Sequence, residues 1–390
     1  MKKDTLLAHK GRKPSANHGV VNPPVYHAST IVYPTVAALK AAQASRHQPG
    51  AVTYGRHGTP TTFALEDAMA ALEGGFRAAT LPSGLAAICA ALLAFVKQGD
   101  HVLMVDSVYG PSRAFATGML KNMGVETSFY DPMIGAGIAA LIKPNTKVVF
   151  TEAPGSLTFE VQDIPAIAKA AHAAGAVVLM DNTWAAGYFF SPFAHGVDVS
   201  IHAATKYVVG HSDAMLGLVV TNEQHFMTVK NAVAGLGYCA GPDDIYLGLR
   251  GLRTMGVRLK QHYATGLHLA RWLQQRPEVE RVLHPALPDA IGHAFWKRDF
   301  TGACGLFSCV LKPASEAAVA AMLDGMSLFA MGYSWGGFES LILHVEPNKI
   351  RTVKPFDAAG PVLRLHAGLE DPDDLIADLR GGFERLAKVK

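Results

Sequence analysis

Residues 147–184 read "KVVFTEAPGSLTFEVQDIPAIAKAAHAAGAVVLMDNTW". Residues 147–154 and 176–184 are short apolar segments rich in valine, and this composition predicts two buried strands. Residues 164–175, which lie between them, have the alanine-rich pattern of a helix. A strand, a helix and a second strand in this order are typical of parallel strands joined by a crossover helix. The segment therefore predicts an α/β fold.

The same alternation continues toward the N-terminus. Residues 61–73 predict a helix that ends at Gly74-Gly75, because glycine is favoured just after the end of a helix. Residues 100–106 predict another buried strand and residues 118–124 another helix. Since the strands are continuously apolar, we expect both faces of the sheet to be covered. The sequence thus predicts a mainly parallel sheet with helices on both faces.

The chain has 390 residues, which at about 150 residues per domain indicates two or three domains. Residues 1–60 are rich in proline, glycine, histidine and threonine, so we expect an irregular N-terminal arm. We expect a large domain over 61–250 and a smaller α+β domain over 251–390, which includes a strand at 302–312. A long helix over 243–277 is expected to join the two domains.

Composition excludes several classes of protein. The formal net charge is +3 and there is no Lys/Arg-rich run, so we expect neither a nucleic-acid partner nor a membrane-surface partner. The 4 cysteines form neither a CxxC pair nor a Cys/His cluster, so we expect reduced thiols and no metal site. The apolar runs are shorter than the roughly 18 residues that span a bilayer. We therefore expect a cytoplasmic protein.

Two candidate site residues lie where strands and helices of such a sheet begin or end. Asp181 ends an apolar strand, the edge at which open α/β sheets bind ligands. The alternative is a turn or capping aspartate. Ser83 and Gly84 precede a strongly helical run, and the start of a helix can bind an anion through its free N–H groups. The alternative is an ordinary N-cap.

Lys206 and Tyr109 are two further candidates. Lys206 has small or apolar neighbours, which disfavour its charged form and lower its pKa, as a nucleophilic amine requires. The alternative is a lysine whose stem lies along the surface. Tyr109 follows the strand predicted at 100–106 and could stack on a flat ligand, or it could be a core tyrosine.

Together these candidates describe a site for pyridoxal 5'-phosphate (PLP). The cofactor needs an anion-binding helix start, an aromatic side chain, a carboxylate for its ring nitrogen and an amine for a Schiff base. Ser83, Tyr109, Asp181 and Lys206 supply these groups in that order. The glycine-rich fingerprints of NAD-binding and ATP-binding sites are absent from the sequence.

The sequence resembles the cystathionine β-lyase branch of the Cys/Met metabolism family of PLP enzymes, nearly from end to end. The most specific segments are "YGRHGTPT" (54–61), "DNTWAAG" (181–187), "AATKYVVGHSDAMLG" (203–217), "YSWGGFESL" (333–341) and "RLHAGLEDPDDL" (364–375). The resemblance implies fold type I, with a large PLP-binding domain and a smaller C-terminal domain.

The resemblance also implies a role for each matching residue. Lys206 forms the Schiff base with the cofactor, Asp181 pairs with the ring nitrogen, and Tyr109 stacks on the ring. The residues implied to surround the phosphate are Ser83, Gly84, Leu85 and Thr205. Many relatives carry a serine at the position of Ala203, so one contact to the phosphate is expected to be missing or supplied by Thr205 or by backbone.

Other implied contacts involve the substrate and a second subunit. Tyr54 and Arg56, in the N-terminal arm, reach the phosphate of a neighbouring subunit's cofactor. The protein is thus expected to be at least a dimer, and a homotetramer if it follows the family. Arg364 binds the substrate α-carboxylate, since a guanidinium binds a carboxylate bidentately, and Ser334 lies near Lys206.

The segment at 333–337, "YSWGG", indicates which bond is cut. Relatives that act at the γ-carbon carry a glutamate before this serine, whereas here Tyr333 and Trp335 flank Ser334 and are expected to contact the substrate. This resembles the β-lyase form. It implies a carbon–sulfur lyase that converts L-cystathionine and water to L-homocysteine, pyruvate and ammonia in methionine biosynthesis. A cystathionine or methionine γ-lyase, or a cysteine desulfhydrase of the same family, is the alternative.

Tyr109 is also expected to assist proton transfer near the leaving sulfur, because a phenol beside a cationic site can have a lowered pKa. The catalytic residues are then Lys206, Tyr109 and Asp181. The range of thioether substrates and the choice between dimer and tetramer stay open at this point.

Overall fold

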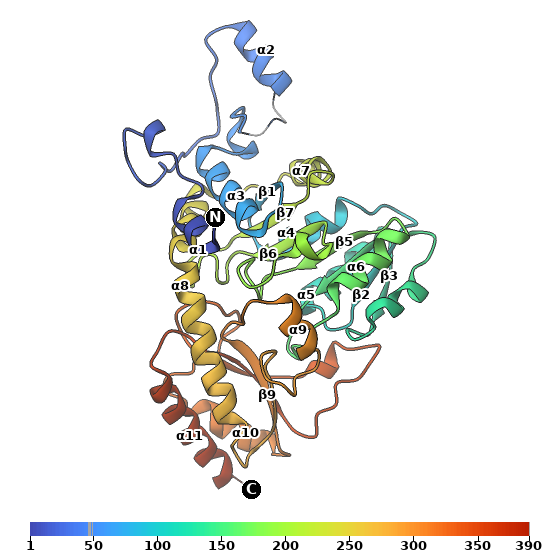
Figure 1. Cartoon of the computed structure of the whole chain (residues 1–390), viewed down its shortest axis with the longest axis vertical. Coiled ribbons are helices and arrows are strands. Elements are labelled where there is room, and N and C mark those ends of the chain that lie inside the picture. The colour runs from blue at the N-terminus through green and yellow to red at the C-terminus, as the bar shows by residue number, and fades with distance from the viewer. Residues whose placement is uncertain (46–47, 49, 390) are drawn as a thin grey trace.

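The computed structural model describes residues 1–45, 48 and 50–389, and these form two sheets joined by a long helix (Figure 1). Residues 46, 47 and 49 of the expected arm and residue 390 of the expected C-terminal domain lie outside the described residues. Within the described residues, no helix is both long enough and apolar enough to span a membrane.

The large sheet has seven strands among the described residues, in the order β1-β7-β6-β5-β4-β2-β3. The strands are β1 (Arg77–Leu81), β2 (His101–Val105), β3 (Glu126–Tyr130), β4 (Thr146–Glu152), β5 (Val177–Asp181), β6 (Val199–Ala203) and β7 (Gly217–Thr221). The five strands from β3 to β6 in this order run parallel, and β7 is antiparallel to both of its neighbours. The predicted mainly parallel sheet is confirmed, and β2, β4 and β5 are the strands expected from the sequence.

The strands are apolar because their side chains are enclosed. β2 and β7 are buried along their whole length, and β5 is buried from its second residue onward. Helices α3 (Pro60–Glu73), α4 (Gly84–Leu93), α6 (Ile164–Ala173) and α7 (Phe226–Gly235) pack against these strands. α3 ends at Gly74, whose φ of 78° is the left-handed conformation that glycine adopts without strain.

The helix predicted over 118–124 begins earlier than the sequence indicated. α5 (Gly110–Phe115) carries Pro111 in its first turn, a position at which the fixed φ of proline favours the start of a helix. A π-helical turn over Ala116–Leu120 then continues it. The start of this helix is consequently close to β2 in the chain.

Helix α8 (Pro242–Leu273) is the long helix expected over 243–277, and it connects the two sheets (Figure 1). Leu249, Leu252 and Leu259 of this helix belong to the core of the large sheet. Its last turns contribute Leu269 and Leu273 to a second core. The boundary between the 61–250 and 251–390 domains falls inside this helix and stays a prediction.

The smaller sheet has four strands among the described residues, in the order β10-β11-β9-β8. They are β8 (Val279–Leu283), β9 (Leu306–Leu311), β10 (Leu341–Val345) and β11 (Val362–His366), and every pair is antiparallel. Helices α9 (His293–Asp299), α10 (Glu316–Asp324) and α11 (Pro372–Lys388) complete this part of the chain. The strand expected at 302–312 is β9.

The N-terminal arm is more regular than expected. α1 (Lys3–His9) packs on the body of the protein, where Leu7 is buried and Arg253 donates to the Leu7 carbonyl over 2.6 Å. α2 (Val36–Ser45) has no buried residue and projects away from the body (Figure 1). The prediction of an irregular arm is therefore wrong for α1 and α2. The other described residues of the arm hold only short 3-10 turns, at Pro14–Ala16 and Gly55–His57.

Candidate active site

A cavity of about 670 Å³ lies where the parallel strands of the large sheet end and the smaller sheet begins. Most of the predicted site residues line it, although they come from distant parts of the chain. These are Ser83, Gly84, Leu85, Tyr109, Asp181, Thr205, Lys206, Tyr333, Ser334, Trp335 and Arg364. Tyr54 and Arg56 are not among the lining residues.

Lys206 lies in the turn that follows β6. Its Nζ donates to the hydroxyl of Ser334 over 2.5 Å and lies 5.5 Å from the ring centroid of Trp335. Burial and the nearby Arg364 lower the pKa of Lys206 to about 8, against the opposing effect of Asp181. The predicted lowering of its pKa is confirmed, and it brings the amine closer to the neutral form that attacks a carbonyl.

Asp181 is the last residue of β5 and is buried, with 7% of its surface exposed. Its Oδ1 accepts from the backbone N–H of Thr183 over 3.0 Å. Burial raises the pKa of Asp181, while hydrogen bonds from Thr183 and the nearby His202 and Lys206 lower it. A cation bound beside this carboxylate would stabilise its charged form.

The start of α4 forms one wall of the cavity. Ser83 is the N-cap of α4, as its alternative interpretation had it, and its side chain accepts from the Ala86 backbone N–H over 3.1 Å. A Cβ at Gly84 would lie 2.4 Å from the Cβ of Ala203, so only glycine fits this close approach. The remaining free N–H groups of this first turn are suited to bind an anion.

Thr205 also lines the cavity, but its hydroxyl already has hydrogen-bond partners within the chain. Its Oγ1 accepts from the Leu216 N–H over 2.9 Å and donates to the Leu216 carbonyl over 3.2 Å. A contact from this hydroxyl to a phosphate would have to replace the bond to the carbonyl.

Tyr109 immediately precedes α5, and its half-exposed side chain lines the cavity. Burial and the carboxyls of Asp181 and Glu152 raise its pKa, against the opposing effect of Arg364. The expectation of a lowered pKa is therefore wrong. A cationic neighbour alone would lower this pKa, but burial and the two carboxyls together have the larger effect.

The segment at 333–337 is held against the lysine. Nη2 of Arg364, from β11, donates to the Ser334 carbonyl over 3.1 Å. A Cβ at Gly336, whose φ is +89°, would lie 3.0 Å from the backbone carbon of Lys206. Tyr333 is 93% exposed, whereas Trp335 is half-buried. The backbone of this segment thus packs directly on Lys206.

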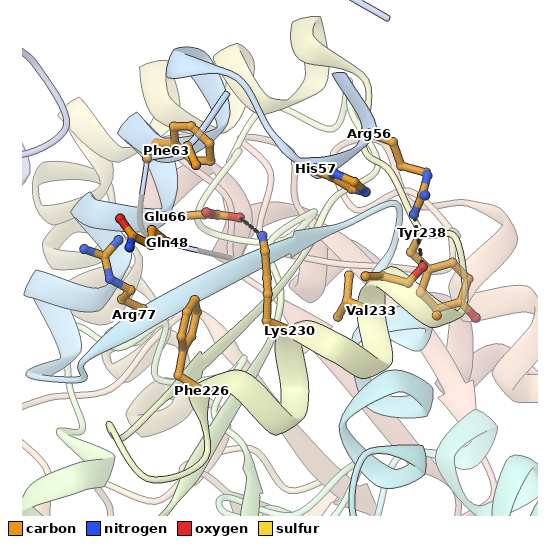
Figure 2. Close-up of a pocket in the computed structure, with 14 residues that line it drawn as sticks. Gln48, Arg56, His57, Phe63, Glu66, Arg77, Phe226, Lys230, Val233 and Tyr238 are labelled. Carbon is orange, nitrogen blue, oxygen red and sulfur yellow. Dashed lines mark hydrogen bonds and ion pairs between the residues drawn. The ribbon is translucent and has the colours of Figure 1, made fainter. Parts of the chain in front are cut away.

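Arg56 lies in a different cavity, of about 300 Å³, between the arm, α3, β1 and α7. Its Nη1 donates to the Ala234 carbonyl of α7 over 3.0 Å (Figure 2). In the same cavity Lys230 points toward the buried Glu66, 3.9 Å away (Figure 2). Within one chain, then, no described residue of the arm lines the cavity that contains Lys206.

Some lining residues were not predicted. Glu152 is the last residue of β4, as Asp181 is the last residue of β5. The preference of ligands for the ends of parallel strands therefore also indicates Glu152. Leu157 and Phe159 have positive φ values of 67° and 57°, and their segment carries no sequence signal for this conformation. Ile350 enters the cavity from a loop after β10, and no local pattern pointed to it.

The residues of the large cavity fit PLP. The lysine has a lowered pKa, and a buried carboxylate lies at the strand ends near it. The start of α4 forms one wall of the cavity. A family model described as Cys/Met metabolism PLP-dependent enzyme matches residues 4–384. The chain belongs to this family. Its cofactor is therefore PLP.

Members of the family with assigned activities are similar over nearly their whole length. Cystathionine beta-lyase MetC of Escherichia coli is 49% identical, with 99% of each chain covered. An L-alanine/L-glutamate racemase of Wolbachia pipientis is 40% identical over 99% of this chain and 98% of its own. The crystal structure of metB from Corynebacterium glutamicum has a TM-score of 0.90 and 31% identity, covering 99% of this chain and 98% of that one.

Proposed function

We propose that the protein is a PLP-dependent carbon–sulfur β-lyase that converts L-cystathionine and water to L-homocysteine, pyruvate and ammonia. The observation that carries the proposal is the contact between Lys206 and the segment at 333–337, whose Ser334 accepts from the amine. The family resemblance places Tyr333 of this segment where relatives that act at the γ-carbon are expected to have glutamate. The name of the E. coli relative, cystathionine beta-lyase, supports the same reaction.

Substrate binding is assigned to the side of the cavity formed by the smaller sheet. The guanidinium of Arg364 lines the cavity and has one hydrogen bond, to the Ser334 carbonyl, among the described residues. Its remaining N–H groups can bind the substrate carboxylate bidentately. Tyr333 and Trp335 flank Ser334 and are assigned to contacts with the rest of the substrate.

Proton transfer at the substrate α-carbon is assigned to Nζ of Lys206. When bound, the cofactor supplies an electron sink for the bond that breaks at this carbon. A lysine with a pKa of about 8 is a usable base near neutral pH. Ser334 orients the amine through its hydroxyl. Asp181 would hold the ring nitrogen of the cofactor in its protonated form.

The cofactor phosphate is assigned to the start of α4, with Ser83, Gly84 and Leu85, and to Thr205. Tyr54 and Arg56 are assigned to the phosphate in a neighbouring subunit. Two observations support an arm that crosses between subunits: α2 has no buried residue, and Val32 and Val36 are 86% and 69% exposed. Apolar side chains exposed together often mark an interface.

A homotetramer, with the arms exchanged between pairs of subunits, accounts for these exposed residues. A cytoplasmic location in a methionine biosynthetic route fits the reaction and the cysteines, which are all free. Reduced thiols are typical of proteins in the cytosol.

Product analysis with L-cystathionine tests the proposed reaction. Pyruvate and homocysteine released in equal amounts are the expected result. Release of 2-oxobutyrate would indicate a γ-lyase, and sulfide from cysteine without turnover of cystathionine would indicate a desulfhydrase. Interconversion of L- and D-alanine without any keto acid would instead match the activity named for the Wolbachia relative. Each of these three results would overturn the β-lyase assignment.

A further inference from the structure

Glu152 lies at the same edge of the large sheet as Asp181. It is the last residue of β4, and the register of the parallel pair places it opposite Asp181 of β5. It also lines the cavity that contains Lys206. The site therefore holds a second carboxyl to which the proposed function assigns no role.

The side chain of Glu152 binds the backbone of Tyr109. Its Oε2 accepts from the Tyr109 N–H over 2.7 Å, at the point where the chain turns from β2 into α5. The loop after β4 makes a second contact with this turn, from the Ser156 N–H to the Ser107 carbonyl over 2.8 Å. Glu152 and the loop after β4 thus bind the turn on both sides of Val108, and Glu152 provides the contact at Tyr109 itself.

The surroundings of Glu152 favour its neutral form. Burial and the neighbouring carboxyl of Asp181 raise its pKa well above the ordinary value, and only the Tyr109 N–H opposes them. A protonated carboxyl still accepts from an N–H through its carbonyl oxygen, and the amide of glutamine can do the same.

Asp181 has more groups that stabilise a negative charge. It accepts from Thr183, and the nearby His202 and Lys206 lower its pKa. Arg364, which also lines the cavity, lowers the pKa of Tyr109 and the pKa of Lys206. Of the two carboxyls, Asp181 is the one suited to carry the charge.

We propose that Glu152 is a positioning residue, which fixes the turn at Tyr109 through the backbone N–H and thereby places the aromatic ring over the cofactor. The proposal rests on the proposed function in one respect, that Tyr109 stacks on the cofactor ring. It makes the hydrogen-bond acceptor at position 152 essential and the negative charge dispensable.

A matched pair of variants separates the acceptor from the charge. Glu152→Gln keeps the acceptor, and Glu152→Met keeps the approximate volume without it. Both are measured without substrate, by the dissociation constant of PLP and by the visible circular dichroism of the bound cofactor. We expect Glu152→Gln to match the wild type within about threefold and Glu152→Met to bind PLP about 10- to 100-fold more weakly, with an altered dichroism band.

Asp198 offers a control for general loss of stability. Its carboxylate accepts from the Val178 backbone N–H over 2.9 Å, next to the opposite ends of β5 and β6. Asp198→Ala should lower the melting temperature without changing the dichroism of bound PLP. Far-UV circular dichroism checks folding, and Glu152→Ala replaces Glu152→Met if the latter does not fold.

A double-variant cycle tests whether Glu152 acts through Tyr109. In a Tyr109→Ala background, where no ring is left to position, Glu152→Met should weaken PLP binding less than about threefold further. Wild-type PLP binding and dichroism in Glu152→Met would overturn the proposal. A Glu152→Gln variant as impaired as Glu152→Met, or fully additive effects in the cycle, would also overturn it. No readout involves a thioether, so failure of the β-lyase assay leaves this test unaffected.

Discussion

The amine of Lys206 and the hydroxyl of Ser334 form a hydrogen bond of 2.5 Å, although 128 residues separate them in the chain. Lys206 follows a strand of the large sheet, whereas Ser334 precedes β10 of the smaller sheet. The chemistry at the lysine therefore depends on how the two parts of the chain are packed together.

Ser334→Ala should lower kcat/KM by about 10- to 100-fold, because a hydrogen bond to a charged group contributes roughly 1.5–3 kcal/mol. Loss of the acceptor also removes support for the protonated amine, so the pKa of Lys206 in the apoenzyme should fall further. The pH dependence of acylation of Lys206 in the apoenzyme, followed by mass spectrometry, measures this pKa. An unchanged pKa would show that the bond does not act on the amine.

The pKa of Lys206 sets the pH at which the apoenzyme takes up its cofactor. The neutral amine attacks the cofactor aldehyde, so the rate should rise with pH and level off above about 8. Stopped-flow absorbance after mixing apoenzyme and PLP across this range measures the midpoint. A midpoint near the ordinary lysine value of 10.5 would contradict the lowered pKa.

Arg364→Ala should raise KM strongly and lower kcat/KM by roughly 30- to 1000-fold, since one charge-assisted carboxylate contact is lost. Arg364→Lys, which keeps the charge without the bidentate geometry, should recover only part of the loss. Steady-state kinetics with cystathionine provide the comparison. A decrease below about threefold in Arg364→Ala would assign carboxylate binding to another residue.

Mixing two inactive variants tests whether the arm crosses between subunits. Lys206→Ala lacks the amine and Arg56→Ala lacks the arm contact, so each should have little activity alone. If the arm completes a neighbour's site, random mixed dimers restore one intact site, and about a quarter of the wild-type activity should return after denaturation and refolding together. Activity no higher than the sum of the two separate variants would indicate that each arm serves its own chain.

Much of the fold could be predicted because its signals are local. The valine-rich segments became β4 and β5, and Gly74 ended α3 in the left-handed conformation. Helix α2 was not predicted because the proline and glycine residues around it indicate turns and irregular structure. None of its residues is buried, so it lacks the apolar face that identifies a core helix in a sequence.

That Asp181 and Lys206 line a cavity could be predicted from a local feature of each residue. Asp181 lies at a strand end, and Lys206 has small neighbours. Properties that depend on several segments of the chain could not be predicted in this way. The raised pKa of Tyr109 arises from burial and from carboxyls of two other strands, which no spacing in the sequence reveals.

Helix α8 contributes side chains to both hydrophobic cores without a break in its 32 residues. A straight helix of this length is a rod of roughly 48 Å. A sharp kink would interrupt its backbone hydrogen bonds, so the continuous helix restricts relative movement of the two cores. A kink near its middle would let the two cores move relative to each other, and the distance between Arg364 and Lys206 would then vary.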